Sequence, residues 1–151
     1  MDEIANFAQP NKLIATSGQP ASGQFAMIAS EGYSVVINLA MPDSNHAIPE
    51  EGEIVTSLGM AYIHIPVPFD APSVDHLRQF IGVMSALDGK RIWVHCVRNW
   101  RVSAFMYHYL RIEKGLSPEQ CRSPVLDEWG PRMDEVWHAF LGLSREEIAA
   151  S

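Results

Sequence analysis

The sequence predicts an α/β fold with a central, mostly parallel sheet of about four to five strands flanked by helices. Short apolar, β-branched segments alternate along the chain with segments of helical periodicity. One of them, residues 33–39 (YSVVINL), is apolar almost throughout, which is typical of a strand covered on both faces. A strand–helix order of this kind implies parallel strands with helices on both faces of the sheet.

The first half of the chain is expected to supply most of the strands. In order, we expect a strand over 12–16, a turn over 17–20, a helix over 24–31, a strand over 33–39, a loop over 41–49, a helix over 49–58 and a strand over 61–67. Gly32 and Gly59 follow the two helices, where glycine commonly ends a helix. Glu50 and Glu51 suit the first turn of the second helix, because acidic side chains there complement the helix dipole.

The second half is predicted to place one more strand between helices and to end in helices. Ser73 can cap a helix whose apolar residues share one face. These are Val74, Leu77, Phe80, Ile81, Met84 and Leu87. A strand follows over 91–95, and a helix is expected over 102–113. Capping boxes at Ser117 and Ser144 predict two further helix starts.

Size and composition bound what the protein can be. A chain of 151 residues can bury a full core, and we expect residues 1–151 to form a single domain. The formal net charge of −7 argues against nucleic acid or an anionic membrane as a partner. The two cysteines have neither disulfide-framework nor zinc-site spacing, so we expect no metal and no cofactor. Neither a signal peptide nor a membrane-spanning segment is evident, so a cytoplasmic location is expected.

The most informative stretch is 95–103 (HCVRNWRVS), where an apolar strand ends in His-Cys just before a helix. A cysteine between a strand end and a helix N-terminus, close to a cation, is stabilised as the nucleophilic thiolate. The same backbone N–H groups can hold an oxyanion, and the fork of an arginine suits phosphate or sulfate. We therefore predict Cys96 as a nucleophile and Arg101 as an anion ligand. A small buried cysteine and an ion-paired arginine are the alternatives.

Three neighbours would support this site. His95 points to the opposite side of the strand from Cys96, so we expect it to bond nearby backbone rather than to act as the base; a core histidine is the alternative. Asn99 is the one residue of 97–100 with ready access to the left-handed backbone region, and we expect it to adopt that conformation. The Ser103 hydroxyl either bonds the sulfur of Cys96 or caps the helix.

Hydrolysis of a phosphate ester also needs a proton donor for the leaving oxygen. Asp70 is the best candidate, because it follows the strand over 61–67, whose carboxyl end should share an edge with the Cys96 loop. The alternatives are Asp43, His46 and Asp75.

The aromatic residues and the second cysteine are read mainly as packing. Phe69 and Trp100 either wall a pocket or belong to the core, whereas Trp129 and Trp137 are most simply core residues. Cys121 lies on a capped helix and is expected to be buried.

Four motifs resemble one protein family when they are taken together. In order, they are TSGQP, EGYSVVINL, LGMAYIHIPV and VHCVRNWRVSAF. They resemble the beta-lactamase-hydrolase-like phosphatase family, a bacterial branch of the protein tyrosine/dual-specificity phosphatase superfamily. The resemblance implies a cysteine phosphatase-like fold in which Cys96 forms a phospho-cysteine intermediate, Arg101 binds the phosphoryl oxygens and an aspartate, here Asp70, acts as general acid. The substrate would be a phosphorylated protein or a small phosphate ester.

The loop departs from the pattern of that superfamily. There, five residues separate the cysteine from the arginine and glycine is common three after the cysteine, whereas here Arg101 comes after four residues and Asn99 takes the glycine's place. One residue turns a helical side chain by about 100°, so Arg101 must approach an anion differently. The expected phosphate-binding loop comprises Val97, Arg98, Asn99, Trp100 and Val102, the last in the family's arginine position.

Two other functions stay open at this point. Cys-x4-Arg is also the loop length of rhodanese-type sulfurtransferases, which would carry sulfur as a persulfide on Cys96. A pseudophosphatase without activity would instead bind a phosphorylated partner, or a free phosphate or sulfate, in the same loop.

Overall fold

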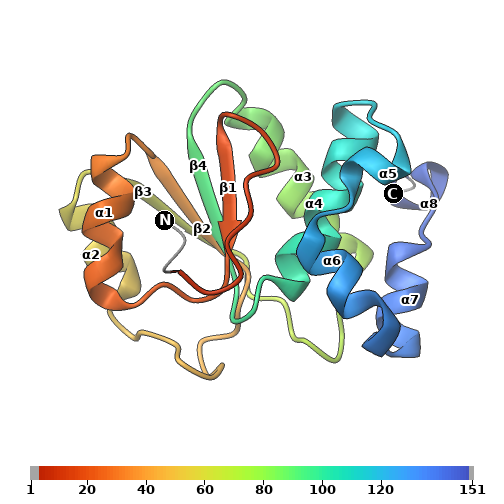
Figure 1. Cartoon of the computed structure of the whole chain (residues 1–151), viewed down its shortest axis with the longest axis horizontal. Coiled ribbons are helices and arrows are strands. Elements are labelled where there is room, and N and C mark those ends of the chain that lie inside the picture. Colours follow the sequence, from red (N-terminus) through yellow and green to blue (C-terminus); the bar gives the residue numbers. More distant parts are fainter. Residues whose placement is uncertain (1–3, 150–151) are drawn as a thin grey trace.

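The computed structural model describes residues 4–149 and confirms the predicted α/β fold (Figure 1). Its elements in order are β1 Ile14–Ser17, α1 Phe25–Ser30, β2 Val35–Asn38, α2 Glu51–Ser57, β3 Ala61–His64, α3 Val74–Ala86, β4 Ile92–His95, α4 Trp100–Glu113, α5 Pro118–Cys121, α6 Pro124–Trp129, α7 Glu135–Leu141 and α8 Arg145–Ala149. Short 3-10 turns precede α1 and follow α6, at Ser22–Gln24 and Gly130–Arg132.

The strands form one parallel sheet in the order β1-β4-β2-β3. Strand β4 therefore lies inside the sheet, with Ile92 opposite Ile14 on one side and opposite Val35 on the other. Because all strands run the same way, their carboxyl ends meet at one edge, the lower edge in Figure 1. Ligand sites in parallel sheets form at this edge, and Cys96 follows the end of β4 there.

Helices cover both faces of the sheet (Figure 1). Helices α1 and α2 lie on one side and α3 and α4 on the other, where α5, α6 and α7 pack against α4, and α8 against α3. Among residues 4–149, no helix combines the length and the apolar character that a membrane span requires.

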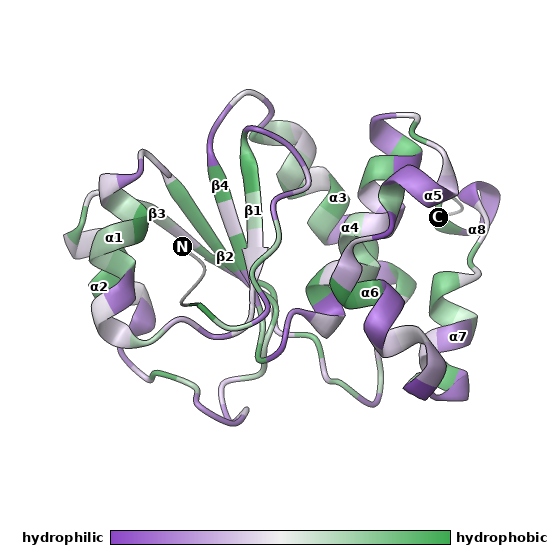
Figure 2. Ribbon diagram, in the orientation of Figure 1, coloured by the Kyte–Doolittle hydropathy of each residue, from purple (hydrophilic) through white to green (hydrophobic). Residues whose placement is uncertain are grey.

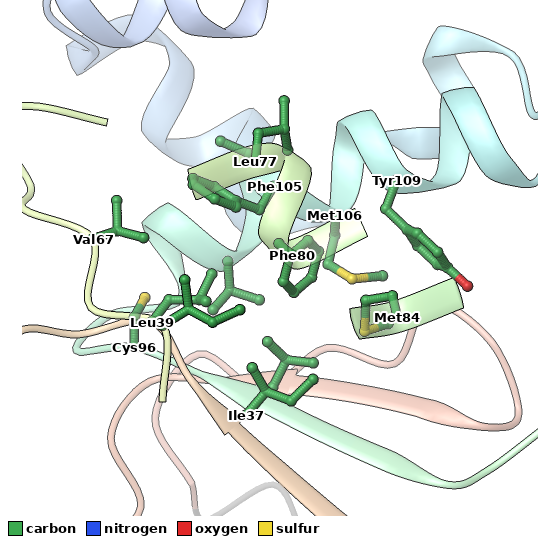
Figure 3. Packing of buried hydrophobic residues seen from close by; sticks show 14 of the residues in the cluster. Ile37, Leu39, Val67, Leu77, Phe80, Met84, Cys96, Phe105, Met106 and Tyr109 are labelled. Atoms are coloured by element: carbon green, nitrogen blue, oxygen red, sulfur yellow. The ribbon is translucent and has the colours of Figure 1, made fainter. Parts of the chain in front are cut away.

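Alternation along the strands supplies two cores. Ala15, Val36 and Trp93 face α1 and α2, whereas their neighbours Val35 and Val94 face α3 and α4. Figure 2 shows the strands as largely hydrophobic. Figure 3 shows the larger core, in which residues such as Ile37, Phe80, Met84 and Phe105 pack together. Burial of each such side chain stabilises the fold by about 1.5–3 kcal/mol.

Element boundaries differ from the predicted ones for identifiable reasons. Strand β3 ends at His64 rather than continuing to residue 67, because Pro66 has no N–H group to donate to a sheet ladder. Helix α4 begins at Trp100, two residues earlier than predicted, because Asn99 takes the N-cap position. The capping boxes at Ser117 and Ser144 form as predicted.

Two C-terminal helices, α6 and α7, were not individually predicted from the sequence. Ser123 and Asp134 cap them, and Ser123 accepts a hydrogen bond from the N–H of Leu126 at 3.1 Å. The dipeptide Ser123-Pro124 repeats the pattern of a cap followed by proline at the first helical position, so the signal for α6 was present.

Candidate functional site

A pocket of about 340 Å³ opens at the carboxyl edge of the sheet, and Cys96 lies at its floor. It is lined by Met41, Asp43, Ser44, Asn45, Phe69, Cys96, Val97, Arg98, Trp100 and Arg101. Cys96 itself has an exposed fraction of 0% and packs with the core, beside Leu39 in the view of Figure 3. The structure therefore brings Cys96 and Arg101 together with three of the five predicted loop residues, and a ligand would reach the sulfur only from the pocket side.

The N-terminus of α4 supplies free backbone donors at this pocket. The first bonded N–H of the helix is that of Ser103, which donates to the carbonyl of Asn99 at 2.9 Å. Within the described part of the chain, the N–H groups of Trp100, Arg101 and Val102 have no acceptor. Free N–H groups at the positive end of a helix dipole form an anion-binding arrangement.

Asn99 makes the sharp turn into this helix. Its φ of 66° is in the left-handed region, as the sequence predicts for a loop without glycine. Its buried side-chain amide donates to the carbonyl of Asn6 at 2.8 Å and to the Thr16 hydroxyl at 3.0 Å. The Ser103 hydroxyl donates to Asn99 Oδ1 at 3.3 Å and accepts from Ser123. Of the two roles open to Ser103, its contacts therefore favour support of the helix start.

Arg101 is held in place by the loop after β3. Its exposed fraction is 5%, and Nη1 donates to the carbonyl of Val67 at 2.8 Å. Its guanidinium carbon lies 5.7 Å from the ring centre of Phe69, within range of a cation–π contact. A guanidinium has five N–H donors, so this bond to Val67 leaves donors for an anion in the pocket.

Gly18 lets the turn after β1 approach the loop that follows Cys96 closely. A Cβ atom at residue 18 would lie 2.5 Å from the carbonyl oxygen of Val97, a distance that real side chains essentially never show. The neighbouring Gln19 N–H donates to the same carbonyl at 3.0 Å. The TSGQP motif therefore fixes the backbone of the loop that follows Cys96.

His95 is joined to a buried carboxylate on the opposite side of β4. Its Nε2 lies 2.6 Å from Glu51 Oε2, and its Nδ1 lies 3.3 Å from the carbonyl oxygen of Cys96. The exposed fractions are 0% for His95 and 2% for Glu51. Gln19 donates to the other Glu51 oxygen at 2.8 Å. As predicted, His95 contacts backbone beside the cysteine; its partner Glu51 was read from the sequence only as a residue of a helix start.

Tyr62 lies close enough to the Glu51 carboxylate to be affected by its charge. Burial, together with the nearby negative charge of Glu51, raises the pKa of Tyr62 to about 12. Its hydroxyl oxygen accepts a hydrogen bond from Asn38 at 3.0 Å. A buried polar network with this many internal partners holds its members in one arrangement.

The four candidate proton donors occupy different places. Asp43 lines the Cys96 pocket, whereas Asp70 is exposed in the loop after β3 and is not among the residues that line it. His46 lines a separate depression, and Asp75 accepts a hydrogen bond from Gln79 in the first turns of α3.

Aromatic side chains form one wall of the pocket. Trp100 stacks on Trp129 with ring centres 5.2 Å apart and an interplanar angle of 9°. Phe69 lies 5.5–6.0 Å from the rings of Trp100, Trp129 and Trp137. Trp137 Nε1 also donates to the Phe69 carbonyl at 2.7 Å. Phe69 and Trp100 thus both line the pocket and pack, and the loop that carries Phe69 is tied to α6 and α7.

The remaining predicted positions lie in the core or away from the pocket. Val102 is buried, so it takes no part in lining the pocket. Cys121 is buried in a separate depression, and burial raises the pKa of its thiol. In the part of the chain that the structure describes, no group of three or more His, Cys, Asp and Glu side chains is arranged to hold a metal ion.

Comparison with known proteins identifies one matching family and a similar solved structure, both described as phosphatases. A family described as "DSP-PTPase phosphatase fused to NAD+ Kinase" matches residues 3–137. A protein of Shewanella putrefaciens CN-32, described as "Putative phosphatase (DUF442)", is 34% identical, with 93% of this chain and 91% of that chain covered and a TM-score of 0.84. No curated protein sequence matches this chain.

More distant structures share the fold. Tk-PTP in its active form is 21% identical over 89% of this chain and 92% of its own, with a TM-score of 0.71. The catalytic domain of the PP-IP phosphatase SIW14 from S. cerevisiae, in complex with citrate, is 14% identical over 95% and 88%, with a TM-score of 0.74.

Proposed function

Because this chain belongs to the DSP-PTPase phosphatase family, we propose that it hydrolyses a phosphate monoester through a phospho-cysteine intermediate on Cys96. The observation that carries the proposal is the position of Cys96 at the floor of a pocket bounded by the N-terminus of α4 and by Arg101. Within the superfamily, the motifs from TSGQP to VHCVRNWRVSAF favour the beta-lactamase-hydrolase-like branch and one catalytic domain over residues 1–151.

Each group near the pocket has a role in the proposed reaction. The N–H groups at the start of α4 and the guanidinium of Arg101 bind the phosphoryl oxygens and stabilise the charge that develops on them. The Cys96 thiolate attacks phosphorus; the S–P bond forms as the ester P–O bond breaks, and an aspartic acid gives its proton to the leaving oxygen. Water then attacks phosphorus, the aspartate takes its proton, and the S–P bond breaks to release phosphate.

The short loop is compatible with this chemistry because Arg101 lies in the pocket. Val102, which occupies the family's arginine position, is buried, whereas Arg101 is one residue earlier and lines the pocket with Cys96. Its bond to the carbonyl of Val67 holds the guanidinium beside the loop after β3.

For the general acid we keep Asp70 as the first candidate and Asp43 as the second. Asp70 directly follows Phe69, which lines the pocket and whose carbonyl accepts a hydrogen bond from Trp137 Nε1. Asp43 already lines the pocket. Replacement of the true acid by Asn should slow esters with poor leaving groups far more than esters with good ones. An equal effect on both classes would remove that aspartate from the role.

The proposed substrate is a phosphorylated protein or a small phosphate ester, handled in the cytoplasm, where a free thiol stays reduced. The fold is shared with a cysteine-to-serine form of TpbA from P. aeruginosa in complex with pTyr, at 12% identity. That likeness shows only that a fold of this kind can hold an aryl phosphate.

The decisive experiment compares wild type, Cys96→Ser and Arg101→Ala on an aryl phosphate, and on thiosulfate with cyanide. We expect aryl phosphate turnover in the wild type and its loss in Cys96→Ser, since hydroxyl is a far weaker nucleophile than thiolate. Cys121→Ser, a matched change of the other buried cysteine, should retain turnover.

Three other outcomes of these assays would contradict the proposed reaction. Turnover that survives Cys96→Ser would exclude the cysteine mechanism. Turnover of thiosulfate with cyanide alone would establish the rhodanese-type reaction through a Cys96 persulfide. Phosphate or sulfate binding without either activity would establish a pseudophosphatase.

A further inference from the structure

Two arginines beside the pocket are without acidic partners, although the chain as a whole is acidic. The guanidinium carbons of Arg98 and Arg132 lie 5.4 Å and 5.5 Å from the ring centre of Trp100. Neither side chain forms a salt bridge with any described carboxylate, while Arg122 and Lys114 pair with Asp127 and Asp88. Both arginines are exposed.

Within the described residues, Lys114 and Arg122 are the two of the chain's 11 Lys and Arg residues that form salt bridges, so the lack of a partner alone does not distinguish Arg98 and Arg132. What distinguishes them is that both guanidinium groups lie over the same indole ring, next to the Cys96 pocket. Two guanidinium groups placed over one indole repel each other, and an anion between them would relieve that repulsion. Trp100 positions both groups, and its own support is the stacked ring of Trp129.

The pair adjoins the reaction site directly. Arg98 and Trp100 line the same pocket as Cys96 and Arg101. Arg132 is not among the residues that line the pocket; it reaches Trp100 from the turn that follows α6. Among the residues that line the pocket, Asp43 is the one carboxylate, and it is a candidate for proton transfer.

We propose that Arg98 and Arg132, both over the ring of Trp100, form a second anion subsite, so that the preferred substrate is a phosphate monoester whose alcohol portion carries a second phosphate. This inference rests on the proposed function and specifies its substrate class. The scissile phosphate lies over Cys96, and the second phosphate is bound by the two guanidinium groups. Arginine forks match phosphate oxygens in charge and geometry.

A matched pair of substrates tests the subsite. Phenyl phosphate has one phosphate, and benzene-1,3-diyl bisphosphate has the same ring with two. The kcat/KM measured for the bisphosphate is halved before the comparison, because it carries two equivalent esters. We expect a kcat/KM for the bisphosphate about 20-fold above that for phenyl phosphate at low ionic strength. Arg98→Gln and Arg132→Gln should each lower this ratio about fivefold, the effect of about 1 kcal/mol per contact. Added salt should lower the ratio as well.

Lys90→Gln is the control, because Lys90 is exposed just before the start of β4, at the far edge of the sheet from the pocket. It removes the same charge and should leave the ratio unchanged. A ratio near one in the wild type, or equal losses in Lys90→Gln and Arg98→Gln, would overturn the proposal.

A binding measurement separates this inference from the proposed hydrolysis. Calorimetry on the Cys96→Ser protein gives the affinity ratio of the two ligands without turnover. Tighter bisphosphate binding that Arg98→Gln and Arg132→Gln abolish would support the subsite even if the wild type hydrolysed neither ester. Equal affinities in a protein that hydrolyses phenyl phosphate would refute the subsite and leave the proposed function intact.

Discussion

Removal of the Glu51 carboxylate should strongly destabilise the protein, because its partners are buried with it. Glu51 and His95 are almost fully buried and 2.6 Å apart, and Gln19 bonds the second carboxylate oxygen. Glu51→Ala leaves His95 Nε2 without an acceptor and removes one of the two hydrogen bonds that the Gln19 amide donates, the other being to the carbonyl of Pro20. Loss of one partner of a buried pair costs about 3–5 kcal/mol, a large part of the usual 5–15 kcal/mol of folding stability.

Glu51→Gln isolates the contribution of charge. The amide keeps the size and one acceptor oxygen for His95 Nε2, so that a neutral hydrogen bond replaces a charge-assisted one there, while its NH2 group cannot accept from Gln19. The difference between these two kinds of bond is about 1–2 kcal/mol. We therefore expect urea unfolding to rank wild type above Glu51→Gln and Glu51→Gln above Glu51→Ala. Glu53→Gln, an exposed carboxylate in the first turn of the same helix, is the matched control and should stay within about 0.5 kcal/mol of wild type.

The contacts between Glu51, His95 and Gln19 should also affect the loop that follows Cys96. His95 Nδ1 lies beside the carbonyl of Cys96, so loss of Glu51 frees the ring that supports this peptide. Phosphate binding to the folded Glu51→Gln protein should weaken, and in a double-mutant cycle with His95→Asn the two changes should not add. Additive effects, or a Glu51→Ala protein within about 1 kcal/mol of wild type, would refute the assignment of Glu51 to this pair.

Three further changes probe other parts of the site and fold. Gly18→Ala should cost about 1–3 kcal/mol and weaken phosphate binding, because its Cβ meets the Val97 carbonyl at 2.5 Å; a neutral effect on both by urea unfolding and calorimetry would contradict this close approach. Burial lowers the pKa of His108 from 6.5 to about 4, so the unfolded state binds a proton first as pH falls from about 6.5 to 4. Unfolding free energy should drop over that window by up to roughly 3 kcal/mol, and a His108→Gln protein with the same pH profile would exclude His108 as the cause. Trp137→Phe removes the hydrogen bond to the loop that carries Asp70, so the free energy of unfolding should fall by about 1 kcal/mol. The Cys96 thiol should also be alkylated faster, because the loop beside the pocket is held less firmly. An unchanged alkylation rate would count against a role of Trp137 in holding that loop.

Much of the fold could be predicted because its signals are local. The segment 33–39 is β-branched and apolar, and β2 forms within it. Asn99 could be assigned its left-handed conformation because the loop has no glycine and Asn tolerates positive φ. Likewise, a cysteine between a strand and a helix pointed to a site at the carboxyl edge of the sheet, and Cys96 lines a pocket there.

The rest depends on contacts between distant segments. Glu51 looks like any acidic residue of a first helical turn, and only the packing of α2 against the sheet buries it beside His95. The loop over 41–49 has no periodic pattern, so nothing local indicates that Asp43 lines the pocket while Asp70 remains outside it. The strand order, too, follows from packing rather than from the order along the chain.

That strand order has a consequence for synthesis of the chain. Strands β1 and β2 do not bond to each other; β4 fills the place between them. A nascent chain that ends before residue 92 therefore exposes a β1 edge and a β2 edge, which can pair with other chains. The segment that closes both edges is the one that ends in His95 and is followed by Cys96. A ribosome-bound intermediate should bind chaperones until this strand emerges, and its pairing then completes the sheet and encloses Cys96.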